Sequence, residues 1–236
     1  MLNMHEKVDY YSNEKIKIEN TVLFGVIEKR NIEIIHLLLQ QDEIDVNKKS
    51  LRSDDQWQKE FTPLQLAIAN SDTEIVQLLL NHKNIKVNMK SNNYDYIVTP
   101  LYTAIREGYK IIVEGYKNII FKLLIKREDV DINLQSIEHG REFINEGEHI
   151  VTREITPLYQ AVKRSMKIDV VKLLLERKDI NINAITKIKQ EKLNRRANDK
   201  IYHKEETALY WALAEGNTEY ALLLLDQENI DIYFKS

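Results

Sequence analysis

The sequence predicts an all-α fold, a solenoid of five helical repeats joined by long hairpin-like connecting loops. One submotif carries this prediction: a Thr that opens a short helix, a Leu-rich second helix, and an aliphatic–x–aliphatic–Asn exit. It recurs in order at about residues 21–47, 62–88, 99–133, 156–183 and 207–233. A repeat this regular is typical of solenoids, in which each unit buries its apolar face on its neighbours.

The first twenty residues precede the first repeat, and we expect them to form an N-terminal capping segment. They include two tyrosines and two isoleucines, which suit the cover of an open repeat face. The unit that starts at Thr21 lacks the Pro and the Ala of later units, as terminal units often do because one face has no neighbour. The prediction is therefore a cap over 1–20 and a single repeat domain over 21–236.

Each first helix has a favourable start. A Thr at the N-cap accepts a hydrogen bond, and Pro at the first helical position lacks only an N–H group that would be unpaired there. Leu64, Ala67 and Ile68 then follow at the spacing of one helical stripe. A small residue that lets two helices approach closely recurs five residues after the Thr, at Ala67, Ala104, Ala161 and Ala212.

The second helix of each unit repeats the apolar spacing with a run of leucines. Leu79 and Leu174 belong to these runs. We expect both side chains to be fully buried between adjacent units. Replacing either with Ala is expected to cost about 2–5 kcal/mol of stability, from lost burial and the cavity left behind.

This pattern resembles the ankyrin repeat. The segments that carry the resemblance are Thr62-Pro63-Leu64-x-x-Ala67, Thr99-Pro100-Leu101-x-x-Ala104, Thr156-Pro157-Leu158-x-x-Ala161 and Thr207-Ala208-Leu209-x-x-Ala212. The family usually has His after Thr-Pro-Leu, where this chain has Gln65, Tyr102, Tyr159 and Tyr210. The resemblance implies helix-turn-helix units with hairpin-like connections and a concave groove beside the first helices.

The third unit contains a local duplication. Glu107-Gly108-Tyr109-Lys110 recurs seven residues later as Glu114-Gly115-Tyr116-Lys117. Seven residues turn a helix by about 700°, nearly two whole turns, so the apolar face stays in register. We expect one helix of this unit to be about two turns longer than its counterparts; the sequence leaves open which one.

Long segments separate the repeats, at residues 48–61, 89–98, 134–155 and 184–206. Loops of this length in a compact array are commonly functional or mobile. Residues 184–204 hold seven Lys and Arg against two Asp and Glu, whereas residues 134–155 hold five Glu against two Arg.

Composition argues against catalysis, so we expect no enzyme, no catalytic residue, no metal ligand and no cofactor. The chain has no cysteine, its six histidines lack metal-binding spacing, and no glycine-rich phosphate loop occurs. His139 and His149 share a glutamate-rich segment, but a solvated loop is favoured there because no helix-spaced pair fixes a metal geometry. Solenoids mostly present binding surfaces, so a non-catalytic protein-interaction scaffold is the predicted function.

Three groups of residues are candidates for contact with a protein partner through the loop tips and the groove. Aromatic residues lie in the first two long loops, where they either bind a partner or fold back to anchor the loop. Positions seven and eight after each Thr face the groove in the family that this chain resembles. The candidates are Trp57, Phe61, Tyr94 and Tyr96 in the loops, Arg106, Lys163 and Arg164 at the helix ends, and Arg195 and Arg196 in the basic segment.

The basic segment 184–204 also supports an alternative, a binder of nucleic acid or another anionic ligand. Aromatic residues are sparse there, with Tyr202 alone, which weakens base stacking as a binding mode. A solvated loop is the favoured interpretation. Trp211, four residues after Thr207, is expected in the core.

The polar N-terminus and the short apolar runs favour an intracellular, cytoplasmic protein with no membrane span.

One position in the second helix is polar in four units, at His36, Gln77, Lys122 and Lys172, but is Leu222 in the fifth. End units normally need a polar outer face. We therefore expect weak self-association through the C-terminal repeat.

Overall fold

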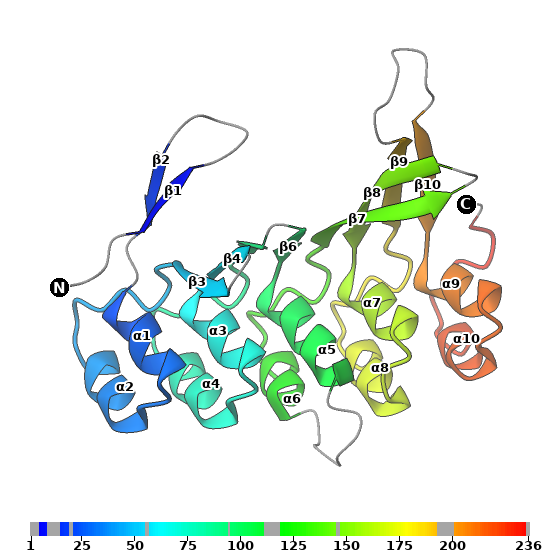
Figure 1. The fold of residues 1–236 in the computed structure, drawn as a ribbon. Coiled ribbons are helices and arrows are strands. Elements are labelled where there is room, and N and C mark those ends of the chain that lie inside the picture. Colours follow the sequence, from blue (N-terminus) through cyan, green and yellow to red (C-terminus); the bar gives the residue numbers. More distant parts are fainter. Residues whose placement is uncertain are drawn as a thin grey trace.

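The computed structural model describes residues 5–8, 15–18, 21–54, 57–93, 95–110, 119–144, 147–192 and 201–234. Its helices lie in two rows, and each repeat contributes one helix to each row (Figure 1). The inner row, next to the strands, comprises α1 (Val22–Glu28), α3 (Pro63–Ala69), α5 (Pro100–Lys110), α7 (Pro157–Lys163) and α9 (Ala208–Ala214). The outer row comprises α2 (Ile32–Leu39), α4 (Thr73–Leu80), α6 (Ile119–Ile125), α8 (Ile168–Leu175) and α10 (Thr218–Leu225).

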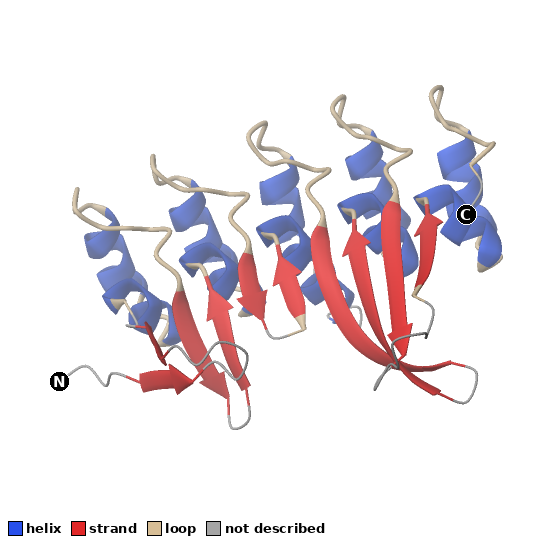
Figure 2. Ribbon diagram, turned by 90° about the horizontal axis from the view of Figure 1, so that it is seen from above, coloured by secondary structure: helices blue, strands red, loops and turns tan. Residues whose placement is uncertain are grey.

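The prediction of an all-α class is wrong, because the connecting segments form antiparallel β-hairpins that project from the inner row (Figure 2). Six strands build one sheet in the order β10-β9-β8-β7-β6-β5. They are β5 (Ser91–Asn93), β6 (Tyr96–Val98), β7 (Ser136–Ile144), β8 (Gly147–Ile155), β9 (Thr186–Lys192) and β10 (Tyr202–Glu206). Two further hairpins pair separately, β1 (His5–Val8) with β2 (Lys15–Ile18) and β3 (Ser50–Asp54) with β4 (Trp57–Phe61).

Buried and exposed residues alternate at the start of β9, which is the pattern of a strand. In β9, Thr186 and Ile188 are buried while Lys187 and Lys189 are exposed. Strand pairing aligns one buried residue from each strand in a single base row, which lies where the hairpins leave the helices. The row consists of Ser91, Val98, Ser136, Ile155, Thr186 and Glu206. Side chains that alternate between a buried face and an exposed face are typical of a strand. The strands form although these segments are rich in charged residues.

The predicted cap over 1–20 contains the hairpin of β1 and β2, which stands beside the first repeat (Figure 1). The structure describes residues 5–8 and 15–18 of this segment. Its capping role stays a prediction.

One apolar core runs through all five units. It combines the inner faces of both helix rows with the exit residues that follow each outer helix, such as Val46, Val87 and Ile132. Leu79 and Leu174 are both fully buried, which confirms their predicted position between adjacent units. The third unit has the longer inner helix, with eleven residues in α5 against seven in each of its counterparts. Residues 111–118, which hold the second copy of the duplication, lie outside the described part of the chain.

Each inner helix begins with the predicted Thr cap. The hydroxyl oxygen of Thr156, for example, accepts a hydrogen bond from the backbone N–H of Tyr159 at 3.2 Å. In two units a buried serine at the start of the following hairpin accepts the backbone N–H of the capping Thr. These pairs are Ser50 with Thr21, at 3.1 Å, and Ser136 with Thr99, at 3.2 Å. Helix start and hairpin start are thereby bonded to each other.

An asparagine ladder joins consecutive repeats along the side of the array. The exit Asn of a unit donates its side-chain N–H to a backbone carbonyl of the next unit and accepts a backbone N–H two residues further on. Asn133 is typical, with 2.7 Å to the oxygen of Asp179 and 2.8 Å to the nitrogen of Asn181. Asn47, Asn88 and Asn183 make the same pair of bonds. The fifth unit has Tyr233 at this position, and its side chain is 83% exposed.

The ladder predicts that Asn133→Ala lowers the free energy of unfolding by about 1–3 kcal/mol, because two backbone groups lose their partners. Urea unfolding followed by circular dichroism measures the change. Tyr233→Ala is the matched control, since it alters the same repeat position at a residue that is 83% exposed. Equal effects of the two substitutions would show that the ladder contributes nothing measurable.

Candidate partner-binding surface

The corner between the inner helices and the six-stranded sheet gathers charged and aromatic side chains. Strand pairing places five residues in a second row, two residues beyond the base row along each strand: Tyr96, Glu138, Arg153, Ile188 and Lys204. Residues directly opposite each other in an antiparallel sheet share a face. This row contacts α5 at Arg106, the C-terminal end of α7 at Arg164 and α9 at Tyr210. We call the assembly the corner surface, comprising Tyr96, Arg106, Glu138, Arg153, Lys163, Arg164, Lys204 and Trp211.

Two buried tyrosines bond the inner helices to the strands at this corner. Tyr102 of α5 donates its hydroxyl to Glu138 of β7, and Tyr159 of α7 donates its hydroxyl to Glu206 of β10. Both tyrosine side chains are fully buried. Burial raises the pKa of each phenol well above its ordinary value, and the neighbouring carboxylate raises the pKa further. Both hydroxyls therefore stay protonated and act as donors.

Arg106, near the end of the described part of α5, lies against the strands. Its guanidinium carbon is 5.3 Å from the ring centre of Tyr96, which is the geometry of a cation–π contact. The same guanidinium lies 3.1 Å from the carboxylate of Glu107.

Lys163, the last residue of α7, lies over two aromatic rings. Its ammonium nitrogen is 5.2 Å from the ring centre of Trp211 and 5.8 Å from that of Tyr159. The two rings meet edge to face, with their centres 5.7 Å apart and their planes at 61°. Burial lowers the pKa of Lys163, and the positive charge of Arg153 lowers it further.

The remaining cations of the corner surface are paired with carboxylates. Arg164 lies 3.7 Å from Glu138, and Lys204 lies 2.6 Å from Glu206. Arg153 contacts Glu142 across the paired strands β7 and β8. The surface is consequently polar but nearly neutral, which suits a protein ligand more than a polyanion.

Comparison with known proteins agrees with this architecture. A family model described as ankyrin repeats (3 copies) matches residues 23–136 and 111–236. The chain belongs to the ankyrin repeat family. Among solved structures, the crystal structure of EF0377, an ankyrin repeat protein, is 20% identical, with 87% of this chain and 97% of that chain covered and a TM-score of 0.40. A comparison with curated proteins gives no match.

Ankyrin repeats are in general protein-interaction modules, and the described helices of this one include none long and apolar enough to cross a membrane. Four of the residues singled out from the sequence meet at the corner surface: Tyr96, Arg106, Lys163 and Arg164. Trp211, expected in the core, is instead partly buried and contributes its ring to the same place.

The other residues singled out from the sequence lie elsewhere. Phe61 ends β4 with 4% of its surface exposed and belongs to the core of this ankyrin repeat array, so it anchors its hairpin and is not presented at a loop tip. The backbone of Trp57 lies in β4, opposite Asp54. Tyr94, Arg195 and Arg196 lie outside the described residues.

Sequence reasoning missed the strand residues of the corner surface, namely Glu138, Arg153, Lys204 and the buried Glu206. All four lie in segments that were interpreted as loops from their length and charge. One pattern that marks these segments as strands is the alternation at residues 186–189 of β9, where Thr186 and Ile188 are buried and Lys187 and Lys189 are exposed. The second such pattern is a Ser or Thr three residues after each exit Asn, which places Ser50, Ser91, Ser136 and Thr186 at the hairpin bases.

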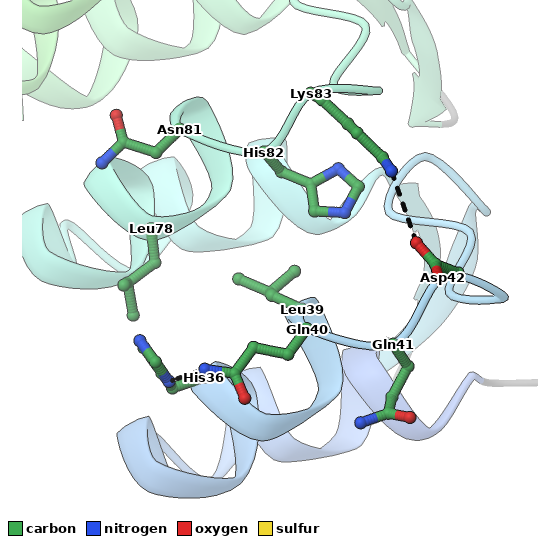
Figure 3. A pocket seen from close by; sticks show the side chains of 9 residues that line it. All are labelled: His36, Leu39, Gln40, Gln41, Asp42, Leu78, Asn81, His82 and Lys83. Carbon is green, nitrogen blue, oxygen red and sulfur yellow. Dashed lines mark hydrogen bonds and ion pairs between the residues drawn. The ribbon is translucent and has the colours of Figure 1, made fainter.

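A pocket on the outer row offers no comparable site. It lies between α2 and α4, and Figure 3 shows His36 and His82 well apart in its wall. Lys83 lies 3.3 Å from Asp42 at its rim, and His36 pairs with Gln40 at 3.1 Å. Across the described ranges, no group of three or more His, Cys, Asp or Glu side chains is arranged to hold a metal ion.

The buried bond between Tyr159 and Glu206 predicts a specific pH dependence. Because the pKa of Tyr159 is raised in the folded state, its contribution to stability is complete below about pH 10 and declines above it, as the unfolded chain releases the phenolic proton first. Tyr159→Phe should cost about 1–2 kcal/mol at neutral pH and reduce the loss of stability between about pH 10 and 11. Urea unfolding at each pH measures both effects. Tyr202→Phe, at a 57% exposed side chain, should follow the wild type.

Proposed function

We propose that this ankyrin repeat protein is a non-catalytic scaffold that binds a protein partner across the corner surface. The observation that carries the proposal is the meeting of Arg106, Lys163 and Arg164 with the rings of Tyr96, Tyr159 and Trp211. Arg, Tyr and Trp are the residues most enriched in the energetically dominant parts of protein interfaces. An intracellular, cytoplasmic location is part of the proposal.

The support comes from how firmly these side chains are held. Their positions are fixed from one side by helix ends and from the other by strands of a six-stranded sheet. Side chains held in this way lose little conformational entropy when a partner binds. The loop-tip residues Trp57 and Tyr94 remain predicted contributors to the same function.

A protein partner is favoured over the nucleic-acid alternative. In the described part of the basic segment, two of the four lysines pair with carboxylates, since Lys189 contacts Glu191 and Lys204 lies beside Glu206. Phosphate binding needs cations that are not already neutralised, and it gives a steep dependence on salt. We expect binding of the partner to vary only weakly with salt concentration.

Site-specific photo-crosslinking tests the proposal. p-Benzoylphenylalanine replaces Trp211 in the corner surface or, as the control, the exposed Lys172 of α8 on the outer row. Irradiation in an extract of the source cells should give protein adducts from position 211 and none from position 172, as judged by gel electrophoresis and mass spectrometry. Adducts that form equally from both positions would contradict binding at the corner.

We also propose weak self-association through the C-terminal repeat. Leu222 is 63% exposed, and Leu213, Leu225 and Ile232 expose further apolar surface on the same repeat. The residues that correspond to Leu213 and Ile232 in the other four units are buried by the next repeat, as Ile68 and Val87 are in the second. Exposed apolar side chains gathered on one repeat favour association.

Leu222→Lys is expected to weaken this association, because a charged side chain resists removal from water. Analytical ultracentrifugation of both proteins across the micromolar range should show a rise in mean mass with concentration for the wild type alone. Lys172→Leu, the reverse change at the matching position of the fourth unit, reports the effect of one exposed Leu elsewhere. Identical monomers of wild type and Leu222→Lys would disprove the proposal.

A further inference from the structure

We infer that Lys163 is the anchor for a carboxylate group in an acidic segment of the protein partner. This inference rests on the proposed function of the corner surface, and it specifies the chemistry of the ligand. Lys163 occupies the middle of that surface, between Arg106 on α5 and Lys204 on β10.

Lys163 differs from the cations around it in having no anionic partner among the described residues. Arg106, Arg153, Arg164 and Lys204 each contact a carboxylate. Among the described residues, none brings a carboxylate oxygen within 4 Å of the Lys163 ammonium, which instead lies over the rings of Tyr159 and Trp211. The rings hold the charge in place and leave its hydrogen-bond donors available to a ligand.

The nearest acidic side chains are already engaged. Glu138 accepts the hydroxyl of Tyr102 and lies beside Arg164. Glu206 accepts the hydroxyl of Tyr159 and lies beside Lys204, with only 2% of its surface exposed. Their charges are neutralised within the protein, so they repel an incoming carboxylate only weakly.

The surroundings of Lys163 make a counter-charge favourable. Its side chain is partly buried, and burial together with Arg153 lowers the pKa of its ammonium by more than the nearby Glu138 and Glu206 raise it. A carboxylate that approaches from the solvent supplies a charge-assisted hydrogen bond in a partly desolvated place, where such bonds are strong.

A carboxylate fits this site better than a phosphate group. Phosphates in proteins are usually bound by several donors, and arginine forks are preferred for that purpose. The guanidinium groups of Arg106, Arg153 and Arg164 are held by Glu107, Glu142 and Glu138. Among the described cations of the corner surface, the Lys163 ammonium is the one without a carboxylate contact. Its single positive charge matches the single negative charge of an Asp or Glu side chain.

A displayed library of random twelve-residue peptides supplies the probe. Peptides are selected on the full chain, and the enriched sequences are synthesised with a fluorescent label for anisotropy titrations. We expect one Asp or Glu to recur at a fixed place. Lys163→Met keeps the aliphatic stem over the rings and should weaken binding by about 10- to 100-fold. Lys163→Arg should retain most of the affinity, and Lys172→Met, on the outer row, should have no effect.

A second substitution in the peptide tests the contact itself. Changing the recurrent acidic residue to its amide should weaken binding to the wild type but leave binding to Lys163→Met unchanged, because that protein has already lost the interaction. An equal loss on both proteins would overturn the inference. The nuclear magnetic resonance signal of the Lys163 side chain gives an independent readout, since a bound carboxylate should raise the pKa of that ammonium.

The outcomes for Trp211→Ala separate this inference from the proposed function. Peptides that lose affinity for Trp211→Ala but bind Lys163→Met normally would leave the corner surface as the binding site and disprove the role of Lys163. Peptides that are indifferent to both substitutions would disprove the corner surface as the site as well. If the selected peptides share runs of several Asp or Glu residues, and their affinity falls steeply with salt concentration, the ligand is a polyanion. That result would overturn the inference of a single carboxylate.

Discussion

The hydrogen bonds from Tyr102 to Glu138 and from Tyr159 to Glu206 join the two parts of the molecule that the corner surface requires. A buried carboxylate is tolerated only when donors replace the water it has lost. Here the donor comes from an inner helix and the acceptor from a strand, so each tyrosine hydroxyl reaches its carboxylate acceptor only when helix and hairpin are docked. The position of every other corner residue follows from that docking.

Charge pairing at the corner then defines what the surface offers to a ligand. With Arg106, Arg153, Arg164 and Lys204 matched to carboxylates, the surface has little net field. Association is therefore expected to depend on shape, aromatic contact and local pairing more than on long-range attraction. Lys163 differs from these cations because its described partners are aromatic rings. Rings stabilise an ammonium group less than a carboxylate does.

The helical half of the fold was predictable from the sequence, and the strand half was not. Capping Thr residues and leucine runs mark helices locally, and the burial of Leu79 and Leu174 followed directly from their spacing. The described strands are mostly exposed or half-buried, and their sequences are rich in charged residues. Lys187 and Lys189 therefore resemble a basic loop, although Thr186 and Ile188, which alternate with them, are buried. For the site, the repeat register predicts the helix-end positions, whereas Glu138 and Glu206 accept hydrogen bonds from tyrosines 36 and 47 residues away in the chain, a contact that no local pattern reveals.

The asparagine ladder has a consequence for how such an array changes over evolution. Each rung joins a side-chain amide to backbone atoms of the next unit, as Asn133 does with Asp179 and Asn181. Backbone groups are the same whatever the sequence, so the rung does not depend on which unit comes next. The rung itself thus needs no compensating substitution when a repeat is duplicated or removed, whereas contacts between specific side chains, such as Tyr159 with Glu206, need both partners.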